Sequence, residues 1–253
     1  MSRGGLGGIV PPEETPPAYY AARPGAWRDW WTLLHPPYTA WHLSYAVIGA
    51  ALAPRVQLTN LIATVGAFFL ATGLAAHALD ELRGRPLRTA IPAAALVAVV
   101  AAGLLGALAL GVCGVVRVGW PLVPYMVAGP VLVIAYNAEL FGGLMHTDVG
   151  FAAAWGAFPL LTAYTAQTGG LAVAPVLAAA GAFALSSAQR WLSTPARNIR
   201  RRAERVEGRI TFADGRTVPV TAEGLLEPLE RALRAASWAI MLLAAALAVA
   251  RLA

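Results

Sequence analysis

The chain has 253 residues, of which 58% are hydrophobic and only 13% are charged. Soluble domains carry about a quarter charged residues, so this composition excludes an ordinary soluble enzyme and a disordered binding module. Its 19 basic residues are all Arg and outnumber the 13 acids, for a net charge of +6. In so apolar a chain, basic excess indicates loops that face anionic headgroups, and not nucleic acid.

The N-terminal segment differs in composition from the rest of the chain. Residues 1–26 are rich in Gly and Pro and lack the apolar core of a signal peptide, so we expect a flexible tail there. The single cysteine, Cys113, cannot form an intrachain disulfide, and we interpret it as a small packing residue.

Seven apolar segments follow, and they predict an all-α bundle of about seven transmembrane helices. A spanning helix needs about 20 mostly apolar residues. The first and fourth segments are short, and Pro124 and Pro130 interrupt the fourth; neighbouring helices can satisfy the backbone groups that these prolines free. The predicted spans are 38–53, 58–79, 91–116, 120–136, 149–167, 171–189 and 232–250.

The Arg residues are unevenly divided between the two ends of these spans. With the N-terminus inside, 16 of the 19 Arg lie on the cytoplasmic side and only Arg55, Arg117 and Arg251 lie outside. Because basic loops stay in the cytoplasm, we predict an integral protein of the cytoplasmic (inner) membrane with its N-terminus cytoplasmic and its C-terminus outside.

The polar stretch before the last span has three parts. Residues 193–208 continue the sixth span as a basic helical end, and 209–220 form two β-patterned runs around Asp214-Gly215, which predicts a hairpin. Because two strands alone are marginally stable in water, we expect the hairpin to rest on the cytoplasmic face of the bundle. Residues 222–237 carry leucines at helical spacing, as in an interfacial helix.

These segments predict four regions. They are a tail at 1–26, a bundle of six spans at 27–192, a cytoplasmic basic segment with hairpin and interfacial helix at 193–231, and a C-terminal span at 232–253.

Histidines and acids near the spans all fall at cytoplasmic ends. Ionisable groups at membrane depth cost several kcal/mol unless they are paired or hydrated, so their convergence predicts a polar cavity that opens to the cytoplasm. The alternative is that these helix ends are polar because they meet headgroups. The residues are His35, His42, His77, Asp80, Glu81, Glu139, His146 and Asp148.

The sharpest cluster is formed by His77, Asp80 and Glu81. Spacings of three and four place these side chains on one helix face. That face could coordinate a divalent ion through oxygen and imidazole, or it could form a structural network with the arginines that follow.

Two further groups of polar residues can each be interpreted as a binding site or as a structural feature. Glu139, His146 and Asp148 form either a binding site for a polar substrate head or a solvated loop. A basic run after the sixth span either anchors the chain to headgroups or binds an anionic phosphate, and it contains Arg197, Arg200, Arg201 and Arg202.

Three segments resemble UbiA-type intramembrane prenyltransferases, over about residues 33–192. LLHPPYTAWHLSYAVIGAALA is similar to the family's first span, with His35-Pro36-Pro37 in place of its Arg-Pro. GLAAHALDELRGRPLRT resembles the family's first Asp-rich motif. YNAELFGGLMHTDVGFAAAWGAFPLLTAYTAQTGG resembles a stretch that runs through a Gly-Glu loop into a span ending in Gln-Thr-Gly.

The resemblance implies a helical bundle around a lipid-accessible cavity, where Asp-rich motifs hold Mg²⁺ ions that bind a prenyl diphosphate. Carboxylates are needed because they hold the cations against a strongly anionic leaving group. By this resemblance Asp80 and Glu81 are the catalytic and metal-binding carboxylates, and His77, at the family's Asn position, is a third catalytic residue. Arg85 falls near the position of a further aspartate.

The family's second Asp-rich motif has no counterpart here. The segment after the sixth span reads SSAQRWLSTPARNIRRR and has no acid before Glu204. The resemblance therefore implies one Mg²⁺ ion instead of two, with arginines neutralising the phosphate. The predicted substrate-binding residues are Arg85, Glu139, His146, Asp148, Gln189, Arg190 and Arg197.

Three functions remain open on these grounds. We favour a divergent prenyl or lipid transferase that acts on an isoprenoid diphosphate at the cytoplasmic face of the bilayer. The alternatives are a membrane metalloenzyme built on the His/acid clusters, and a non-catalytic UbiA-like protein that binds a lipid or serves as a subunit. The expected partners are the bilayer and an isoprenoid or other lipid substrate.

Overall fold

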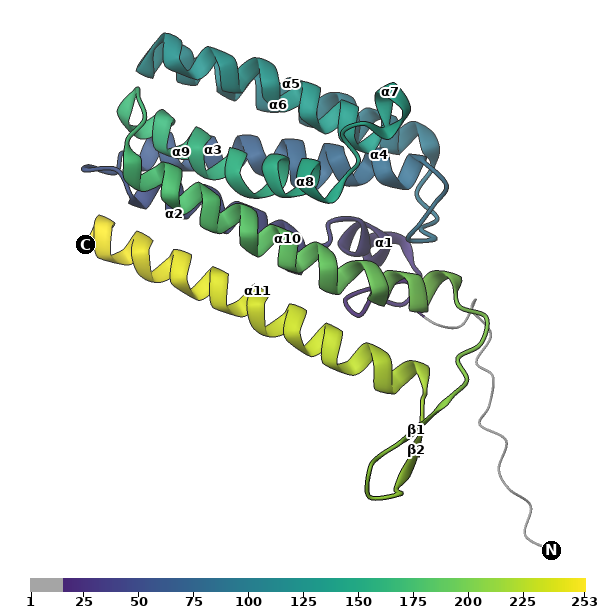
Figure 1. Cartoon of the computed structure of the whole chain (residues 1–253). Coiled ribbons are helices and arrows are strands. Elements are labelled where there is room, and N and C mark those ends of the chain that lie inside the picture. Colours follow the sequence, from purple (N-terminus) through teal and green to yellow (C-terminus); the bar gives the residue numbers. More distant parts are fainter. Residues whose placement is uncertain (1–15) are drawn as a thin grey trace, which may run out of the picture.

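The computed structural model of the chain describes residues 16–253, which form a bundle of long helices with a small hairpin at one end (Figure 1). The first half contains α1 (Ala26–Leu33), α2 (Pro36–Ala51), α3 (Leu58–Phe68), η1 (Phe69–Ala76), α4 (His77–Leu82) and α5 (Ala93–Val118). The second half contains η2 (Trp120–Leu122), α6 (Val123–Asn137), α7 (Leu140–Gly143), α8 (Asp148–Phe151), η3 (Ala152–Ala157), α9 (Phe158–Thr168), α10 (Val173–Arg202), β1 (Arg209–Thr211), β2 (Thr217–Pro219) and α11 (Ala222–Leu252).

Five helical stretches of the described residues are long and apolar enough to cross a membrane. This finding confirms the all-α class, and it gives five candidate membrane spans where the sequence predicts about seven. The other two predicted spans correspond to α2, which has only 16 residues, and to α10, whose second half is polar. The five stretches are Leu58–Leu82, Ala93–Val118, Trp120–Asn137, Asp148–Thr168 and Ala222–Leu252.

Two of these spans contain π-helical turns. The helix over Leu58–Leu82 is π-helical at Phe69–Ala76, and the helix over Asp148–Thr168 is π-helical at Ala152–Ala157. A π-turn changes the direction in which the following side chains point from the helix, and such turns are frequent at functional sites. The first one leads directly into His77, so it sets the direction in which the predicted His/acid cluster points.

Helix α2 lies inside the bundle and carries much of its core. Trp41 and Tyr45 are almost completely buried beside Leu160 of α9, and Trp41 Nε1 donates a hydrogen bond to the Tyr45 hydroxyl at 2.6 Å. Gly49, one turn further along, lies against the Leu160 carbonyl, which an added Cβ would meet at 2.1 Å. The absence of a side chain at Gly49 therefore allows α2 and α9 to approach closely.

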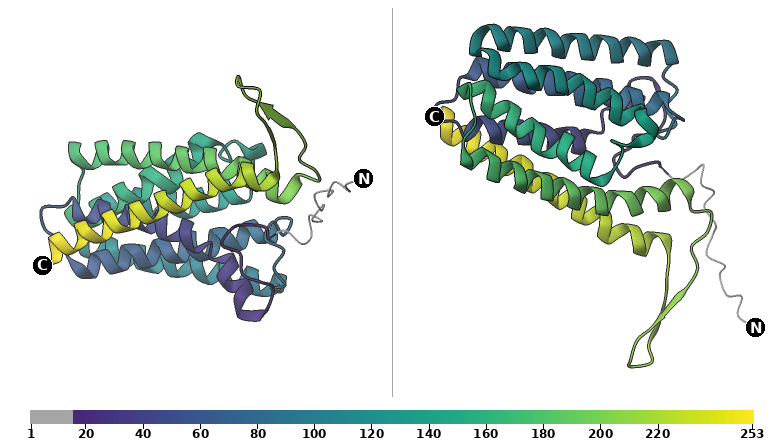
Figure 2. Two further views of the ribbon diagram at one scale, coloured as in Figure 1. Left: turned by 90° about the horizontal axis from the view of Figure 1, so that it is seen from below. Right: turned by 45° about the horizontal axis from the view of Figure 1, so that its top comes forward.

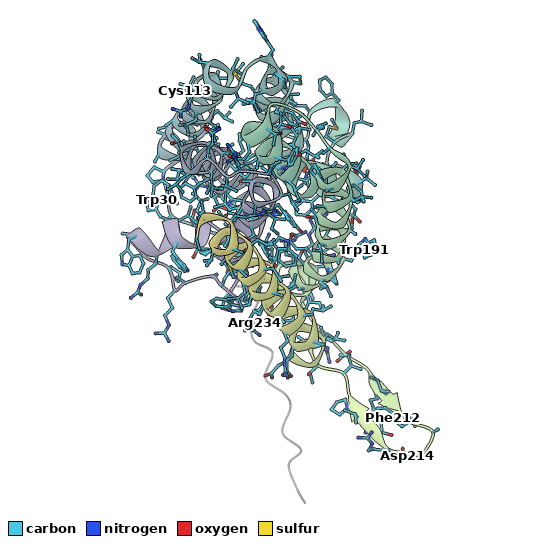
Figure 3. The ribbon with its side chains drawn as sticks, turned by 90° about the vertical axis from the view of Figure 1, so that its left-hand side faces the viewer. Trp30, Cys113, Trp191, Phe212, Asp214 and Arg234 are labelled. Carbon is cyan, nitrogen blue, oxygen red and sulfur yellow. The ribbon has the colours of Figure 1, made fainter. Side chains whose placement is uncertain are left out.

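The predicted hairpin is confirmed. Strands β1 and β2 pair antiparallel with Ile210 opposite Val218, and Gly215 takes a left-handed φ of +83° in the turn. All strand residues are exposed, and the hairpin projects away from the bundle, with Phe212 and Asp214 near its tip (Figure 3). The sequence analysis expected the hairpin to rest on the bundle, and this expectation was wrong.

The predicted interfacial helix and the last span form one continuous helix, α11. Its first turn is capped by Thr221, whose hydroxyl accepts a hydrogen bond from the Gly224 N–H at 3.0 Å. A single buried face runs from Leu226 and Leu233 to Ile240, so the two segments share the same packing surface on the bundle. The end of α11 and the hairpin lie at opposite ends of the molecule (Figure 2).

Residues 16–25, which fall within the predicted flexible tail, pack against the hairpin end of the bundle. The Ala22 N–H donates to the Thr32 hydroxyl at 3.0 Å, and Arg201 Nε donates to the Pro17 carbonyl at 3.0 Å. Ala18 is buried. The rest of that tail, residues 1–15, lies outside the described residues.

Candidate functional site

A polar cavity of about 480 Å³ lies at the end of the bundle from which the hairpin projects. Its wall is formed by residues 17–20 together with residues of α2, η1, α4, α6, α10 and α11. Helices distant in sequence thus converge at the end of the bundle that the sequence analysis predicts to be cytoplasmic. Seven of the ten predicted site residues line it, namely His77, Asp80, Glu139, His146, Gln189, Arg190 and Arg197.

Glu81 does not reach the cavity, although it shares a helix with Asp80. Its side chain is fully buried, and its carboxylate accepts hydrogen bonds from the Leu87 N–H at 2.9 Å, the Thr89 N–H at 2.9 Å and the Thr89 hydroxyl at 2.8 Å. Glu81 therefore holds the loop between α4 and α5 in place. Its predicted role as a metal ligand next to Asp80 is not compatible with these contacts.

Arg85 and Asp148 also lie off the cavity wall. Arg85 has a left-handed φ of +52°, and its guanidinium donates to the Ile91 carbonyl at 2.6 Å within the same loop. The side chain of Asp148 is 55% exposed and pairs with Arg190 Nε at 2.8 Å. Asp148 thus acts on the site indirectly, by orienting Arg190, whose Nη1 donates to the Tyr136 hydroxyl at 2.6 Å.

The acids of the cavity are not gathered into one preassembled metal site. Among residues 16–253, no group of three or more His, Cys, Asp or Glu side chains could hold a metal ion. Asp80 faces the cavity, but Glu139 is paired with Arg83 at 2.8 Å, and Glu81 bonds to the loop. Because Mg²⁺ is usually held by one or two carboxylates together with substrate phosphates and water, Asp80 is the carboxylate of the predicted pair that could hold such an ion in the cavity.

Helix α10 supplies most of the positive charge of the site. We call Arg190, Arg197, Arg200, Arg201 and Arg202, which all line the cavity, the arginine wall. Arg200 is neutralised by Glu230 of α11, with Nη2 and Oε2 2.9 Å apart. Arg201 Nη2 is buried and has no hydrogen-bond partner among the described residues, and burial lowers the pKa of its guanidinium. The wall therefore retains an unsatisfied, charged donor.

The sequence analysis missed an aromatic cluster beside this wall. The rings of Tyr19 and Tyr20 lie edge-on to each other at 5.2 Å, and Tyr20 also meets Tyr38 at 5.5 Å. Burial raises the pKa of Tyr19 to about 12 and that of Tyr20 further, so both hydroxyls are neutral. The sequence feature that could have pointed to this cluster is that Tyr19 and Tyr20 are the only aromatic residues in 1–26.

His35, which begins the sequence His-Pro-Pro, stacks on His77 with 4.2 Å between ring centroids and 14° between ring planes. It holds a left-handed φ of +47° immediately before α2. Burial, reinforced by the charges of His77 and Arg201, keeps the pKa of His35 well below its usual value of 6.5.

We expect acidification to destabilise the protein through His35. The unfolded chain takes up a proton at His35 near pH 6.5 and the folded chain does not, so the contribution of the neutral ring is present above pH 6.5. It is lost as the pH falls through the folded-state pKa, by at most about 1.4 kcal/mol per pH unit. Thermal unfolding in detergent between pH 7.5 and 5.0 tests this.

The matched variant for this titration is His35→Asn, because Asn tolerates the left-handed backbone and does not titrate. The unfolding midpoint of His35→Asn should fall less on acidification than that of the wild type. Equal pH dependence in the two proteins would show that His35 is not the responsible group.

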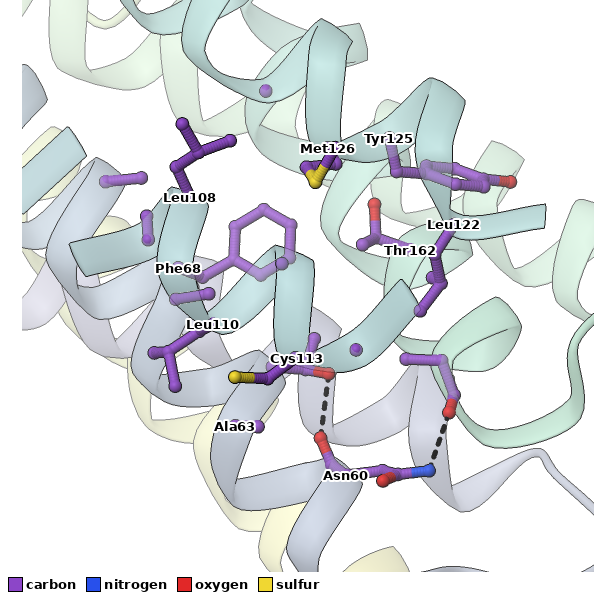
Figure 4. Close-up of a pocket in the computed structure, with 18 of the residues that line it drawn as sticks. Asn60, Ala63, Phe68, Leu108, Leu110, Cys113, Leu122, Tyr125, Met126 and Thr162 are labelled. Carbon is purple, nitrogen blue, oxygen red and sulfur yellow. Dashed lines mark hydrogen bonds between the residues drawn. The ribbon is translucent and has the colours of Figure 1, made fainter. Parts of the chain in front are cut away.

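A second, apolar pocket of about 300 Å³ lies between α3, α5, α6 and α9. Phe68, Leu108, Leu122 and Met126 are among the residues that line it (Figure 4). Cys113, interpreted from the sequence as a small packing residue, also lies on the wall of this pocket and is exposed.

The polar cavity thus combines an arginine wall, four histidines, partly buried tyrosines and the carboxylate of Asp80. Comparison of the chain with protein-family models, with curated proteins and with solved structures finds no match.

Proposed function

We propose that the chain is an integral membrane protein that binds the phosphate or diphosphate head of a lipid in the polar cavity, with an isoprenoid diphosphate as the favoured ligand. The excess of positive charge in the cavity wall carries this proposal. The lining includes six Arg and three acids, and two of the acids, Glu139 and Glu230, are already paired with Arg83 and Arg200.

The remaining charges favour a multivalent anion. Arg197, Arg201 and Arg202 have only Asp80 as an opposing acid on the cavity wall. Arg201 Nη2 is a buried donor without a partner among the described residues, and a buried charged donor is costly until an acceptor reaches it. Phosphate oxygens are well suited to this, because guanidinium groups bind them through charge-assisted hydrogen bonds.

The lipid character of the ligand follows from the position of the cavity. Its walls belong in part to the candidate spans Leu58–Leu82 and Trp120–Asn137, so a bound head would lie next to the bilayer. The resemblance to UbiA-type proteins supports the same choice and adds the cytoplasmic side, where the Arg-rich ends are predicted to lie.

Arg201→Gln should weaken binding of geranylgeranyl diphosphate to the purified protein in detergent by about ten- to a hundredfold. A hydrogen bond to a charged group contributes about 1.5 to 3 kcal/mol, and here the bond and the charge are lost together. Calorimetric titration measures the affinity, with Arg216→Gln on the exposed hairpin as the matched control. Geranylgeraniol, which has no phosphate, should bind poorly to all three proteins.

Asp80→Asn distinguishes direct binding by arginine from binding through a metal. If the arginines hold the anion directly, removing the carboxylate removes a repulsion, and the affinity for the diphosphate should rise without Mg²⁺. Binding that requires Mg²⁺ and disappears in Asp80→Asn would instead support the magnesium mechanism implied by the family resemblance. Equal binding of the diphosphate and the alcohol would contradict the proposal as a whole.

Transfer of the prenyl group to an acceptor is the second candidate function. It is favoured by His77 and Asp80 of the segment GLAAHALDELRGRPLRT, both of which lie on the cavity wall. Release of inorganic pyrophosphate from geranylgeranyl diphosphate would indicate such turnover. Tight binding without release would support the non-catalytic alternative, a lipid-binding protein or subunit.

A further inference from the structure

All four histidines of the chain line the polar cavity. Three of them are held in the same way, by a hydrogen bond from the ring to a backbone carbonyl. A carbonyl oxygen only accepts, so Nδ1 carries the proton and Nε2 of the neutral ring is left as an acceptor. The bonds run from His42 to Trp155 at 2.9 Å, from His77 to Gly73 at 3.1 Å and from His146 to Tyr136 at 3.1 Å.

The fourth ring, that of His35, also has unused hydrogen-bonding capacity. Its Nε2 atom is buried and has no partner among the described residues. Burial and the nearby charges favour the neutral ring, as the lowered pKa of His35 shows. We call His35, His42, His77 and His146 the histidine set.

The histidine set is not complementary to a phosphate group. Phosphate oxygens and unprotonated Nε2 atoms are both acceptors, so they do not bond to each other. A ligand that satisfies both the arginine wall and the histidine set must carry hydrogen-bond donors as well as the anion. An ammonium group is disfavoured by the six arginines that line the cavity, which leaves neutral hydroxyl groups.

The geometry of the rings argues against a transition metal as the ligand. His35 and His77 are stacked nearly parallel, with 14° between their planes, so their in-plane lone pairs run side by side and do not converge. A metal needs its ligands to point at a common centre.

We infer that the histidine set binds hydroxyl groups next to the phosphate. These belong either to the same lipid head, as in a polyol or sugar phosphate, or to a separate alcohol that occupies the cavity together with a diphosphate. This inference rests on the proposed phosphate site, and it names the second half of the ligand that this site would accept.

The first experimental arm compares two lipids, phosphatidylinositol 4-phosphate and phosphatidic acid, in detergent micelles. Both carry a phosphate monoester, but only the first adds a ring of hydroxyls. The wild type should prefer the inositol lipid, and His77→Leu should reduce that preference about tenfold, as expected for the loss of one or two hydrogen bonds. His77→Asn, whose amide oxygen accepts, should recover part of it.

The second arm measures binding of geranylgeranyl diphosphate with and without free myo-inositol. A separate alcohol site predicts that inositol raises the affinity of the wild type and not that of His77→Leu. A His77-dependent effect in either arm supports the inference and identifies the source of the hydroxyls. An effect in neither arm, with anion binding intact, overturns it. A wild type that binds none of these anions contradicts the phosphate site itself.

Discussion

Replacing Glu81 with Ala is expected to cost about 3 to 5 kcal/mol of unfolding free energy. The side chain is completely buried, and its two oxygens accept three hydrogen bonds from Leu87 and Thr89, which are themselves buried. Truncation leaves two backbone N–H groups and a hydroxyl without an acceptor. Since these groups shape the loop between α4 and α5, the loop and the adjoining helix end should loosen together.

Thermal and denaturant unfolding in detergent measure this loss. Glu81→Gln should have an intermediate effect, because one acceptor oxygen remains while the amide N–H₂ opposes a backbone donor. The control is Glu227→Ala, which breaks an exposed pair with Arg231 and should change stability by less than about 0.5 kcal/mol. If Glu81→Ala unfolds like the wild type but loses ligand binding, the side chain is a ligand of the cavity, as the sequence analysis expected.

Gly49→Ala is expected to have the second large effect, a loss of about 1 to 3 kcal/mol. Its Cβ would lie 2.1 Å from the carbonyl oxygen and 2.9 Å from the carbonyl carbon of Leu160. These are backbone atoms of α9 and cannot rotate away, so the two helices must separate. The separation would disturb the core around Trp41 and Tyr45.

The control for this substitution is Gly181→Ala on α10. No atom lies within 4 Å of the added methyl group at Gly181, and Ala is favoured over Gly in a helix by about 1 kcal/mol. The two variants make the same chemical change, so we expect unfolding midpoints to move in opposite directions. Equal midpoints would show that α2 and α9 do not pack closely at Gly49.

Much of the architecture was predictable because hydrophobic runs report helices directly. The predicted span at 91–116 corresponds to Ala93–Val118, and that at 149–167 to Asp148–Thr168. The hairpin was predictable for a similar, local reason, since Asp-Gly between β-patterned runs favours a tight turn. The separation of α11 into an interfacial helix and a last span was not correct, because the two segments share one buried face and form a single helix over Ala222–Leu252.

The candidate site was only partly predictable. Helical spacing placed His77, Asp80 and Glu81 on one face, yet Glu81 turns to the loop while Asp80 faces the cavity. The donors that attract Glu81 come from residues six and eight positions away, and spacing within a helix contains no information about them. Tyr20 was missed because its contacts with His35 and Tyr38 form only once residues 16–25 fold back over the bundle.

The sequence by itself indicated that most of this protein's helices face lipid. It also indicated the end of the bundle at which the polar groups gather. Scarce charge and long apolar runs favour helices that meet lipid, and polar residues concentrated at one set of helix ends must converge when those helices align. The tertiary structure decided which side chains share the cavity: Asp80, the four histidines and the arginine wall, without Glu81 and Arg85. That choice depends on hydrogen bonds in the loop after α4, which hold Glu81 and Arg85 away from the cavity, and on the packing of helices distant in the chain, and this geometry exists only in the folded protein.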